Sequence, residues 1–391
     1  MPLRRLTLPA LLLAASFLTP QTALAAACPA PGEWRLDDGR HTTNAAMMHQ
    51  LADQQVVLLG EQHDRLAHHR WQLHTLSGLH GHRDDLLIGL EMLPRESQPA
   101  LDAWVAGELS ESQFLDKSGW HQYWGHDPAF YLPILHFARM QQIPLVALNI
   151  LPELRQRLAS EGWDSVPTDQ RHHLSPPAAP ETAYREQLEA VFAQHPSGSD
   201  SDDAGNNGLE RFIAAQLAWD RAMAEGIADA LERHTDSDNN APLLVGLVGQ
   251  GHLAYGHGVP HQLADLGVEG QQTLLTWQPN GQCEPPAGLA DALYALGDEA
   301  GFEPSAPPRL GVMIEAHVDG VLVQAVGDDS IAERAGLASG DVIVEAAGRR
   351  MASPGELIAV VRDQPPGTLL PLGVSRDGSL EEVLARFPAQ Q

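Results

Sequence analysis

Four short apolar runs constrain the fold of this chain more than any other feature of its sequence. They span residues 56–59, 86–90, 144–148 and 243–248 and consist almost entirely of aliphatic and small side chains. Strands that are covered on both faces show such unbroken runs, as in parallel sheets packed between helices. Helical patterns lie between the runs, at residues 67–79 and 212–231. The sequence therefore predicts an α/β fold with a mostly parallel sheet flanked by helices.

The length of the chain favours two domains. Its 391 residues, 43% of them hydrophobic, exceed the size of one ordinary domain. Residues 94–141 and 152–194 have helical patterns and predict a helical cap subdomain over the sheet. Residues 284–308 mix prolines with one short helical pattern and are interpreted as a linker. We therefore expect a signal peptide at 1–27, an α/β domain at 28–283, the linker, and a small β-rich domain at 309–388.

The amino terminus has the features of a secretory signal. Arg4 and Arg5 precede an apolar run at residues 8–18, which is too short to span a bilayer comfortably. Small-residue cleavage sites follow, ending at Ala27. The mature protein is therefore expected in the periplasm.

Cys28 stands at the expected cleavage boundary and has two interpretations. It is either the lipidated first residue of a lipoprotein, attached to a membrane, or the partner of Cys283 in a disulfide. The residue at position 25 is Ala, where a lipidation motif usually has Leu. Export makes a disulfide chemically permissible, so we favour the Cys28–Cys283 bond.

Charge and residue composition restrict the function. With 24 Lys and Arg against 51 Asp and Glu, the net charge is -27, which disfavours nucleic acid as a partner. Two cysteines exclude a zinc site with four thiolates. The 19 histidines, concentrated before residue 300, point instead to metal, haem or proton chemistry.

Polar residues follow three of the predicted strands. Glu61 and His63 come after the first strand, Glu91 ends the second, and His252 follows the fourth. The carboxyl ends of strands in an open α/β sheet form its ligand sites, so these four side chains are expected to converge. A carboxylate beside an imidazole can hold a divalent metal, or orient the histidine toward an anion. Each residue alone could also be a buried, hydrogen-bonded structural group.

An aromatic segment at residues 120–131 is the second candidate site. It contains Tyr123, Trp124 and Tyr131, with histidines interleaved. Flat apolar walls with His and Tyr side chains suit a planar ligand whose iron takes an axial N or O donor. The alternative is a helix that packs its aromatic side chains on the core.

From residue 309 the sequence resembles a PDZ domain of the bacterial HtrA type. The resemblance rests on "RLGV" at 309–312, on "AERAGLASGDVIVEAAG", and on a helix that opens at Ser353. It implies that an exposed peptide strand or a peptide C-terminus adds to a strand edge beside the helix. Leu310, Gly311, Val312 and Met313 are then expected to form the loop and the strand, and Leu357 and Val361 on the helix to line the side-chain pocket.

Residues 50–280 resemble the ChaN family of haem-binding, iron-uptake-associated lipoproteins, within the Tiki, TraB and erythromycin-esterase group. The motifs, in order, are "LLGEQHD", "GLEM", "YLPIL", "QLAWDRAMAEGIADAL" and "GQGHLAYGHGVP". The resemblance implies haem in a pocket that a homodimer can share, with a tyrosine ligand to iron and histidine near the propionates. Tyr131 or Tyr123 would be the ligand, with His63 and His252 as polar partners and Trp124 as a wall.

Two functions compete on this basis. The first is an exported haem-binding protein of iron uptake with a peptide-binding PDZ module, and no enzymatic activity is required of it. The second is a metal-dependent periplasmic hydrolase or protease similar to the Tiki relatives. In that alternative, Glu61, His63, Glu91 and His252 hold a divalent metal ion that activates water.

Overall fold

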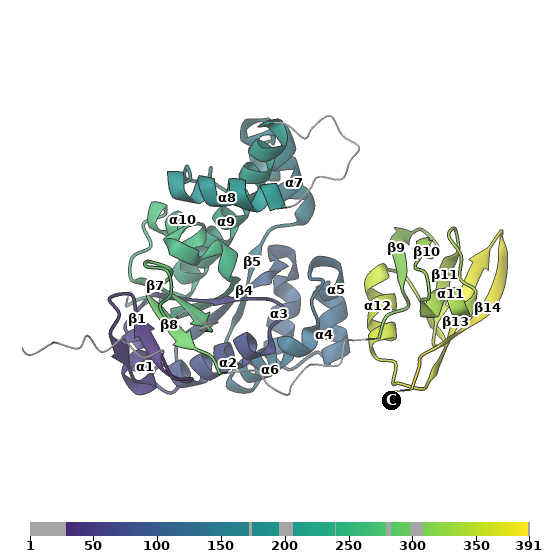
Figure 1. The fold of residues 1–391 in the computed structure, drawn as a ribbon, viewed down its shortest axis with the longest axis horizontal. Helices are drawn as coiled ribbons and strands as arrows, with labels where there is room; N and C mark the ends of the chain where they lie inside the picture. Colours follow the sequence, from purple (N-terminus) through teal and green to yellow (C-terminus); the bar gives the residue numbers. More distant parts are fainter. Residues whose placement is uncertain are drawn as a thin grey trace, which may run out of the picture.

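The chain forms an α/β domain and a smaller, separate β-rich domain (Figure 1). The computed structural model describes residues 29–171, 174–194, 206–238, 240–278, 283–297 and 308–389. Cys28 and the expected signal peptide lie outside the described residues, so the signal peptide, the lipid anchor and the Cys28–Cys283 disulfide stay predictions. No helix in the described ranges is long and apolar enough to cross a membrane.

The first sheet has eight strands in the order β2-β1-β8-β7-β3-β6-β4-β5. The strands from β8 to β5 pair in parallel, whereas β1 pairs antiparallel with β2 and β8. The bounds are β1 Trp34–Leu36, β2 His41–Thr42, β3 Val56–Glu61, β4 Leu86–Pro94, β5 Leu145–Asn149, β6 Leu243–Gly249, β7 Gln271–Trp277 and β8 Ala292–Ala295. The four strands predicted from apolar runs are β3, β4, β5 and β6, which confirms the predicted fold class.

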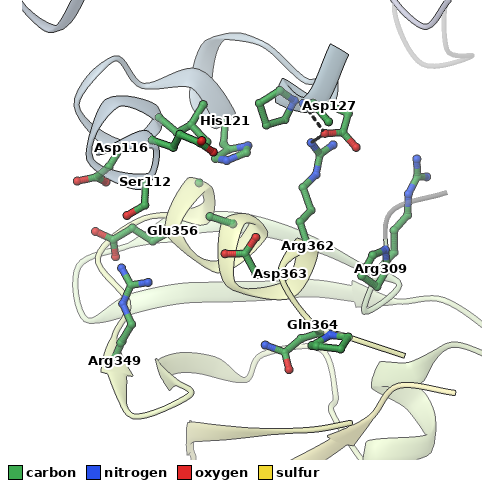
Figure 2. A pocket seen from close by; sticks show the side chains of 18 of the residues that line it. Ser112, Asp116, His121, Asp127, Arg309, Arg349, Glu356, Arg362, Asp363 and Gln364 are labelled. Carbon is green, nitrogen blue, oxygen red and sulfur yellow. Dashed lines mark hydrogen bonds and ion pairs between the residues drawn. The ribbon is translucent and has the colours of Figure 1, made fainter. Parts of the chain in front are cut away.

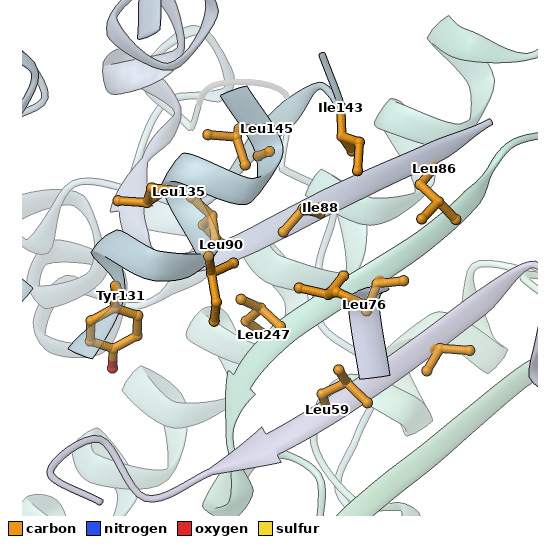
Figure 3. Packing of buried hydrophobic residues seen from close by; sticks show 14 of the residues in the cluster. Leu59, Leu76, Leu86, Ile88, Leu90, Tyr131, Leu135, Ile143, Leu145 and Leu247 are labelled. Carbon is orange, nitrogen blue, oxygen red and sulfur yellow. The ribbon is translucent and has the colours of Figure 1, made fainter. Parts of the chain in front are cut away.

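Each central strand is buried on both faces because its residues alternate between two cores. Leu59, Leu90 and Leu247 face one core, together with helices on that side (Figure 3). Leu58 and Leu244 face the other core, which α9 and α10 cover. Unbroken apolar runs are the consequence of this double coverage.

The helices of the first domain divide between these two faces and a separate cap. On the first face lie α1 Asn44–Ala52, α2 Leu66–His80, α3 Gln98–Val105, α4 Glu111–Lys117, α5 Trp120–Tyr123 and α6 Leu132–Gln141. On the second face lie α9 Asn206–His234 and α10 Val259–Asp265. The cap consists of α7 Pro152–Glu161 and α8 Thr182–Gln194, packed on α9 through small clusters. Short 3-10 turns complete the set: η1 Arg95–Ser97, η2 Pro128–Phe130, η3 Trp163–Ser165, η4 Thr168–Gln170, η5 Gln250–His252 and η6 Ala254–Gly256.

The helical cap is therefore smaller than the sequence suggests. The helices of residues 152–194 form it, whereas those of residues 94–141 pack on the main core. The expected linker at 284–308 also differs, because β8 at Ala292–Ala295 pairs with β7 and β1 in the first sheet. Part of that segment belongs to the first domain.

The second domain is an antiparallel sheet with two helices. Its strand order is β14-β13-β11-β10-β9, with β12 paired to β11. The elements are β9 Val312–His317, β10 Gly320–Val326, α11 Ile331–Ala335, β11 Val342–Ala346, β12 Arg349–Arg350, α12 Pro354–Arg362, β13 Leu369–Arg376 and β14 Ser379–Arg386. Ser353 caps α12 as predicted, since its hydroxyl accepts from the backbone N–H of Glu356 at 3.3 Å. This domain has a hydrophobic core of its own.

Candidate functional site

The candidate site lies at the carboxyl ends of β3, β4 and β6, in the centre of the first sheet. Glu61 is the last residue of β3 and pairs in register with Gly249, the last residue of β6. Glu91 lies in β4, on the other side of β6, and His252 ends the turn η5 that follows β6. Neighbouring parallel strands thus bring the predicted residues to one edge of the sheet.

Glu61 is the centre of the first hydrogen-bond network. Its side chain is buried, and its Oε1 accepts from the Tyr131 hydroxyl at 2.6 Å and from His63 Nδ1 at 3.0 Å. Its Oε2 lies 3.3 Å from Nδ1 of the buried His69 on α2. Burial would raise the pKa of Glu61, but the hydrogen bonds from His63 and His69 hold it well below its usual range. Glu61 is therefore a buried carboxylate anion.

Tyr131 is buried within this network and donates its hydroxyl proton to Glu61. It is 1% exposed, and Trp120 and His69 pack against its ring, with centroids at 5.3 and 4.4 Å. Burial and the charge of Glu61 raise the pKa of its phenol, so the oxygen stays protonated and donates to the carboxylate. The structure thus places this predicted iron ligand in the interior.

A second network surrounds His252. Its Nδ1 lies 2.5 Å from Asp220 Oδ1 on α9, and its Nε2 lies 3.6 Å from Glu91 Oε1. Burial lowers the pKa of this histidine, but the two carboxylates outweigh that effect and raise it. The other Glu91 oxygen accepts from the Gly249 N–H at 2.5 Å, whereas Oε1 is buried without a hydrogen-bond partner. His252 thus lies between two acids, both of which favour its protonated form.

Gly249 brings the two networks together. A Cβ atom at this position would lie 2.8 Å from His63 Cε1 and 3.4 Å from Glu91 Oε2. Only a glycine lets the His63 ring lie this close to the end of β6. The predicted convergence of Glu61, His63, Glu91 and His252 is therefore what the structure shows.

Three ring side chains cover the first network, and we call them the aromatic rim: His63, Trp124 and His126. The His63 ring centroid lies 4.7 Å from that of Trp124 and 4.9 Å from that of His126. The His63 side chain is 30% exposed, and His126 is also half-buried, whereas Trp124 is 8% exposed. The rim thus leaves the side chains of two histidines partly exposed beside a buried acid.

Tyr123 lies on α5, just before Trp124, and is half-buried. Burial and the nearby acids Glu153 and Glu96 raise the pKa of its phenol. It is the more accessible of the two predicted tyrosine ligands, but its surroundings oppose a phenolate.

The sequence did not single out four of the residues that complete the site. They are His69, His126, Asp220 and Arg155, whose guanidinium stacks over Trp219 at 4.0 Å. Asp220 lies within the motif "QLAWDRAMAEGIADAL", which entered the sequence prediction only through the family resemblance. His69 and His126 stand out only once the fold places them beside Glu61 and His63.

The alternative divalent metal site finds no support. Among the described residues, no group of three or more His, Cys, Asp or Glu side chains is placed to hold a metal ion. Oε1 of Glu61 accepts from His63 and Tyr131, whereas its Oε2 has no hydrogen-bond partner and lies 3.3 Å from His69. Glu91 accepts from a backbone N–H and faces His252. Glu61, His63, Glu91 and His252 converge, but as paired acids and histidines.

The second domain carries the predicted groove between β9 and α12. A cavity of ≈ 410 Å³ lies there, and Leu310, Val312, Leu357 and Val361 are among the residues that line it, as expected. Met313 is 62% exposed and does not line it.

Comparisons with known proteins agree with this architecture. The sequence profile of a family described as haem-binding uptake, Tiki superfamily, ChaN, matches residues 47–263, which is more than half of the chain. A PDZ-domain profile matches residues 308–385. No curated protein matches the chain.

Solved structures include a similar fold. ChaN of Campylobacter jejuni, described with cofacial haem binding, is 16% identical, with a TM-score of 0.53 over 67% of this chain and 95% of that one. A serine endoprotease from Yersinia pestis is 25% identical, with a TM-score of 0.20 over 22% of this chain and 30% of that one. The PDZ domain of HtrA3, bound to a phage-derived ligand, is 27% identical, with a TM-score of 0.19 over 20% of this chain and 82% of that one. The chain belongs to the ChaN family of the Tiki superfamily and joins its haem-binding domain to a PDZ domain.

Proposed function

We propose that this protein is an exported haem-binding protein of haem and iron uptake, whose PDZ domain recruits peptide ends. Membership of the ChaN family supports the haem ligand, and the similar fold of a haem-binding ChaN from Campylobacter jejuni agrees with it. The sequence features at residues 1–27 support export to the periplasm. Intact-mass analysis of the exported chain tests this: loss of 1–27 and a Cys28–Cys283 bond are expected, whereas an acyl group on Cys28 would show the lipoprotein alternative.

The aromatic rim suits haem as a ligand. His63 Nδ1 faces the Glu61 carboxylate, so its N–H donates there. Nε2, which lies on the side of Gly249, is then the nitrogen that the neutral ring offers to iron. Trp124 supplies a flat apolar wall beside it, and His126 a second imidazole. Haem, when bound, would supply an iron centre that can accept an imidazole donor. We therefore assign His63 as the candidate iron ligand, with His126 and Trp124 as the other residues that would hold haem.

The other predicted residues take supporting roles in this proposal. Tyr131 donates to Glu61 and so fixes the acid that orients His63. His252 is buried with its Nε2 3.6 Å from Glu91 Oε1, close to the His63 ring. Tyr123, which directly precedes Trp124, is the alternative iron ligand that the family resemblance implies.

The observation that carries the proposal is the His63 ring, 30% exposed and held by a buried carboxylate. Titration of ferric haem into the protein, followed by Soret absorbance, tests it. His63→Ala should weaken haem binding at least tenfold and change the spectrum, whereas His82→Ala, an exposed histidine before β4, should not. Tyr131→Phe should keep the wild-type spectrum. A spectrum that responds to Tyr123→Phe and not to His63→Ala would move the ligand to tyrosine, and no Soret shift at all would refute haem binding.

A further inference from the structure

The two domains meet where α5 packs beside α12. A Cβ atom on Gly355 of α12 would lie 3.3 Å from the Cβ of His121 on α5. At the other end of α12, Arg362 reaches the first domain and lies near Asp127 (Figure 2). A cavity of ≈ 870 Å³ lies between the domains at this junction, with Asp116 and Glu356 on its walls. The first domain therefore stands beside the helix that forms one wall of the PDZ groove.

Residues of both domains line the groove itself. Its apolar wall comes from Leu310, Val312 and Val361 of the second domain, while Trp124 and Gly125 of the first domain close one side. In the described sheet β9 is an edge strand, paired with β10 on one side. An extended peptide that adds to the free edge would lie in the groove that Trp124 also lines.

The charged side chains that line the groove are basic and therefore favour an anionic ligand. Arg309 and Arg362 line it, and no acidic residue is among its described lining residues, although the chain carries a net charge of -27. Arg362 Nη2 donates to the Gly125 carbonyl at 3.5 Å, and its Nη1 lies 3.7 Å from Asp127 Oδ1. Nη1 is buried without a hydrogen-bond partner. This guanidinium is thus held loosely and could pair more closely with a carboxylate.

Trp124 belongs to the groove and to the aromatic rim at once. Its ring centroid lies 4.7 Å from that of His63 and 5.2 Å from that of His126, and the same side chain lines the groove. Asp127, the partner of Arg362, follows His126 directly and caps the turn η2. A change in the contact of Arg362 therefore acts on the segment that carries two of the three rim residues.

We propose that the terminal carboxylate of a peptide with an apolar last residue replaces Asp127 as the partner of Arg362 and releases residues 124–127 from the rim. The proposal rests on the haem site assigned above, because it describes the regulation of that site. Peptide and haem then weaken each other's binding, and thermodynamic linkage requires the same factor in both directions. Peptide binding to the PDZ domain thus promotes release of haem from the first domain.

The test uses the full-length chain and fluorescein-labelled Gly/Ser hexapeptides that end in Val or Phe, as free acids or as C-terminal amides. Fluorescence anisotropy should show binding of at least one free acid and about tenfold weaker binding of its amide. Saturating free acid should weaken haem affinity about fivefold or more in the Soret titration. Without haem, the same peptide should speed hydrogen exchange in residues 120–127.

Three variants separate the contributions. Arg362→Gln should weaken peptide binding and make haem affinity independent of peptide. Asp127→Asn, which keeps an acceptor for the cap of η2, should tighten peptide binding. Arg349→Gln, an exposed arginine that lines only the larger cavity, is the matched control and should behave as wild type.

The outcomes are distinguishable. Haem and peptide that bind without affecting each other, peptide that tightens haem, or no preference for the free acid would each overturn the inference and leave haem binding intact. Peptide could speed hydrogen exchange in residues 120–127 while haem gives no Soret shift. That result would refute haem binding but would still show that the groove and the rim are coupled.

Discussion

At the scale of single residues, the buried carboxylate of Glu61 organises the candidate site. It orients His63, holds His69 and accepts from Tyr131, although these residues come from three separate elements. The sequence predicted that Glu61 and His63 act together because they lie two apart on an extended segment. It could not predict that Tyr131 would be their buried hydrogen-bond donor, since that contact joins residues 70 positions apart.

Glu61→Gln should lower the free energy of unfolding at pH 7 by about 2 kcal/mol, because hydrogen bonds to a buried anion are lost. The native pKa of Glu61 lies below its ordinary value of 4.5, so the stabilisation is complete above that value and disappears as the pH falls. The pKa of His63, which Glu61 helps to raise against the effect of burial, should fall. Urea unfolding from pH 7 to pH 3 and histidine NMR measure both effects.

Glu111→Gln is the matched control, since Glu111 lies 2.9 Å from His136 on the surface. An exposed pair of this kind contributes less than about 1 kcal/mol. If Glu61→Gln and Glu111→Gln lowered the free energy of unfolding equally, burial would not be the reason that Glu61 stabilises the fold.

At the scale of elements, the candidate site lies at the carboxyl ends of the strands, which are also the elements that the sequence predicted best. The runs that became β3, β4, β5 and β6 were readable because burial on both faces removes polar residues from them. The strand β8 was missed because its four residues lie in a segment with prolines and polar neighbours. Its place is fixed by pairing with β7 and β1, which is tertiary information.

Gly249→Ala should weaken haem binding roughly tenfold with little loss of fold, because the new methyl group displaces His63 from the end of β6. Gly251→Ala is the control two residues later, where a Cβ atom meets nothing within 4 Å. Soret titrations and thermal unfolding of both variants measure the effect. Equal haem affinity in the two variants would show that the His63 position does not matter.

At the scale of the whole molecule, each of the two domains is stabilised by hydrophobic clusters of its own. The core of the second domain consists of residues 310–387 only, and the described contact between the domains runs through α5 and α12. The sequence predicted two domains from their different motifs. The juxtaposition of the PDZ groove and Trp124 could not be predicted, because it depends on how the domains pack.

Leu372→Ala should destabilise the second domain by about 2–5 kcal/mol, since Leu372 is fully buried in its core. Calorimetry should show two transitions, of which only one moves, to a temperature lower by about 10 °C or more. Leu380→Ala, at a residue that is 73% exposed, should move neither. A single transition that shifts as a whole would contradict independent cores.

The most direct test of the haem site is the position of iron in a crystal of the haem-loaded protein, located by anomalous diffraction. We expect the iron at bonding distance from the His63 imidazole, with the porphyrin against Trp124 and His126. Iron bound by another residue, remote from the rim, would contradict the assignment of this site.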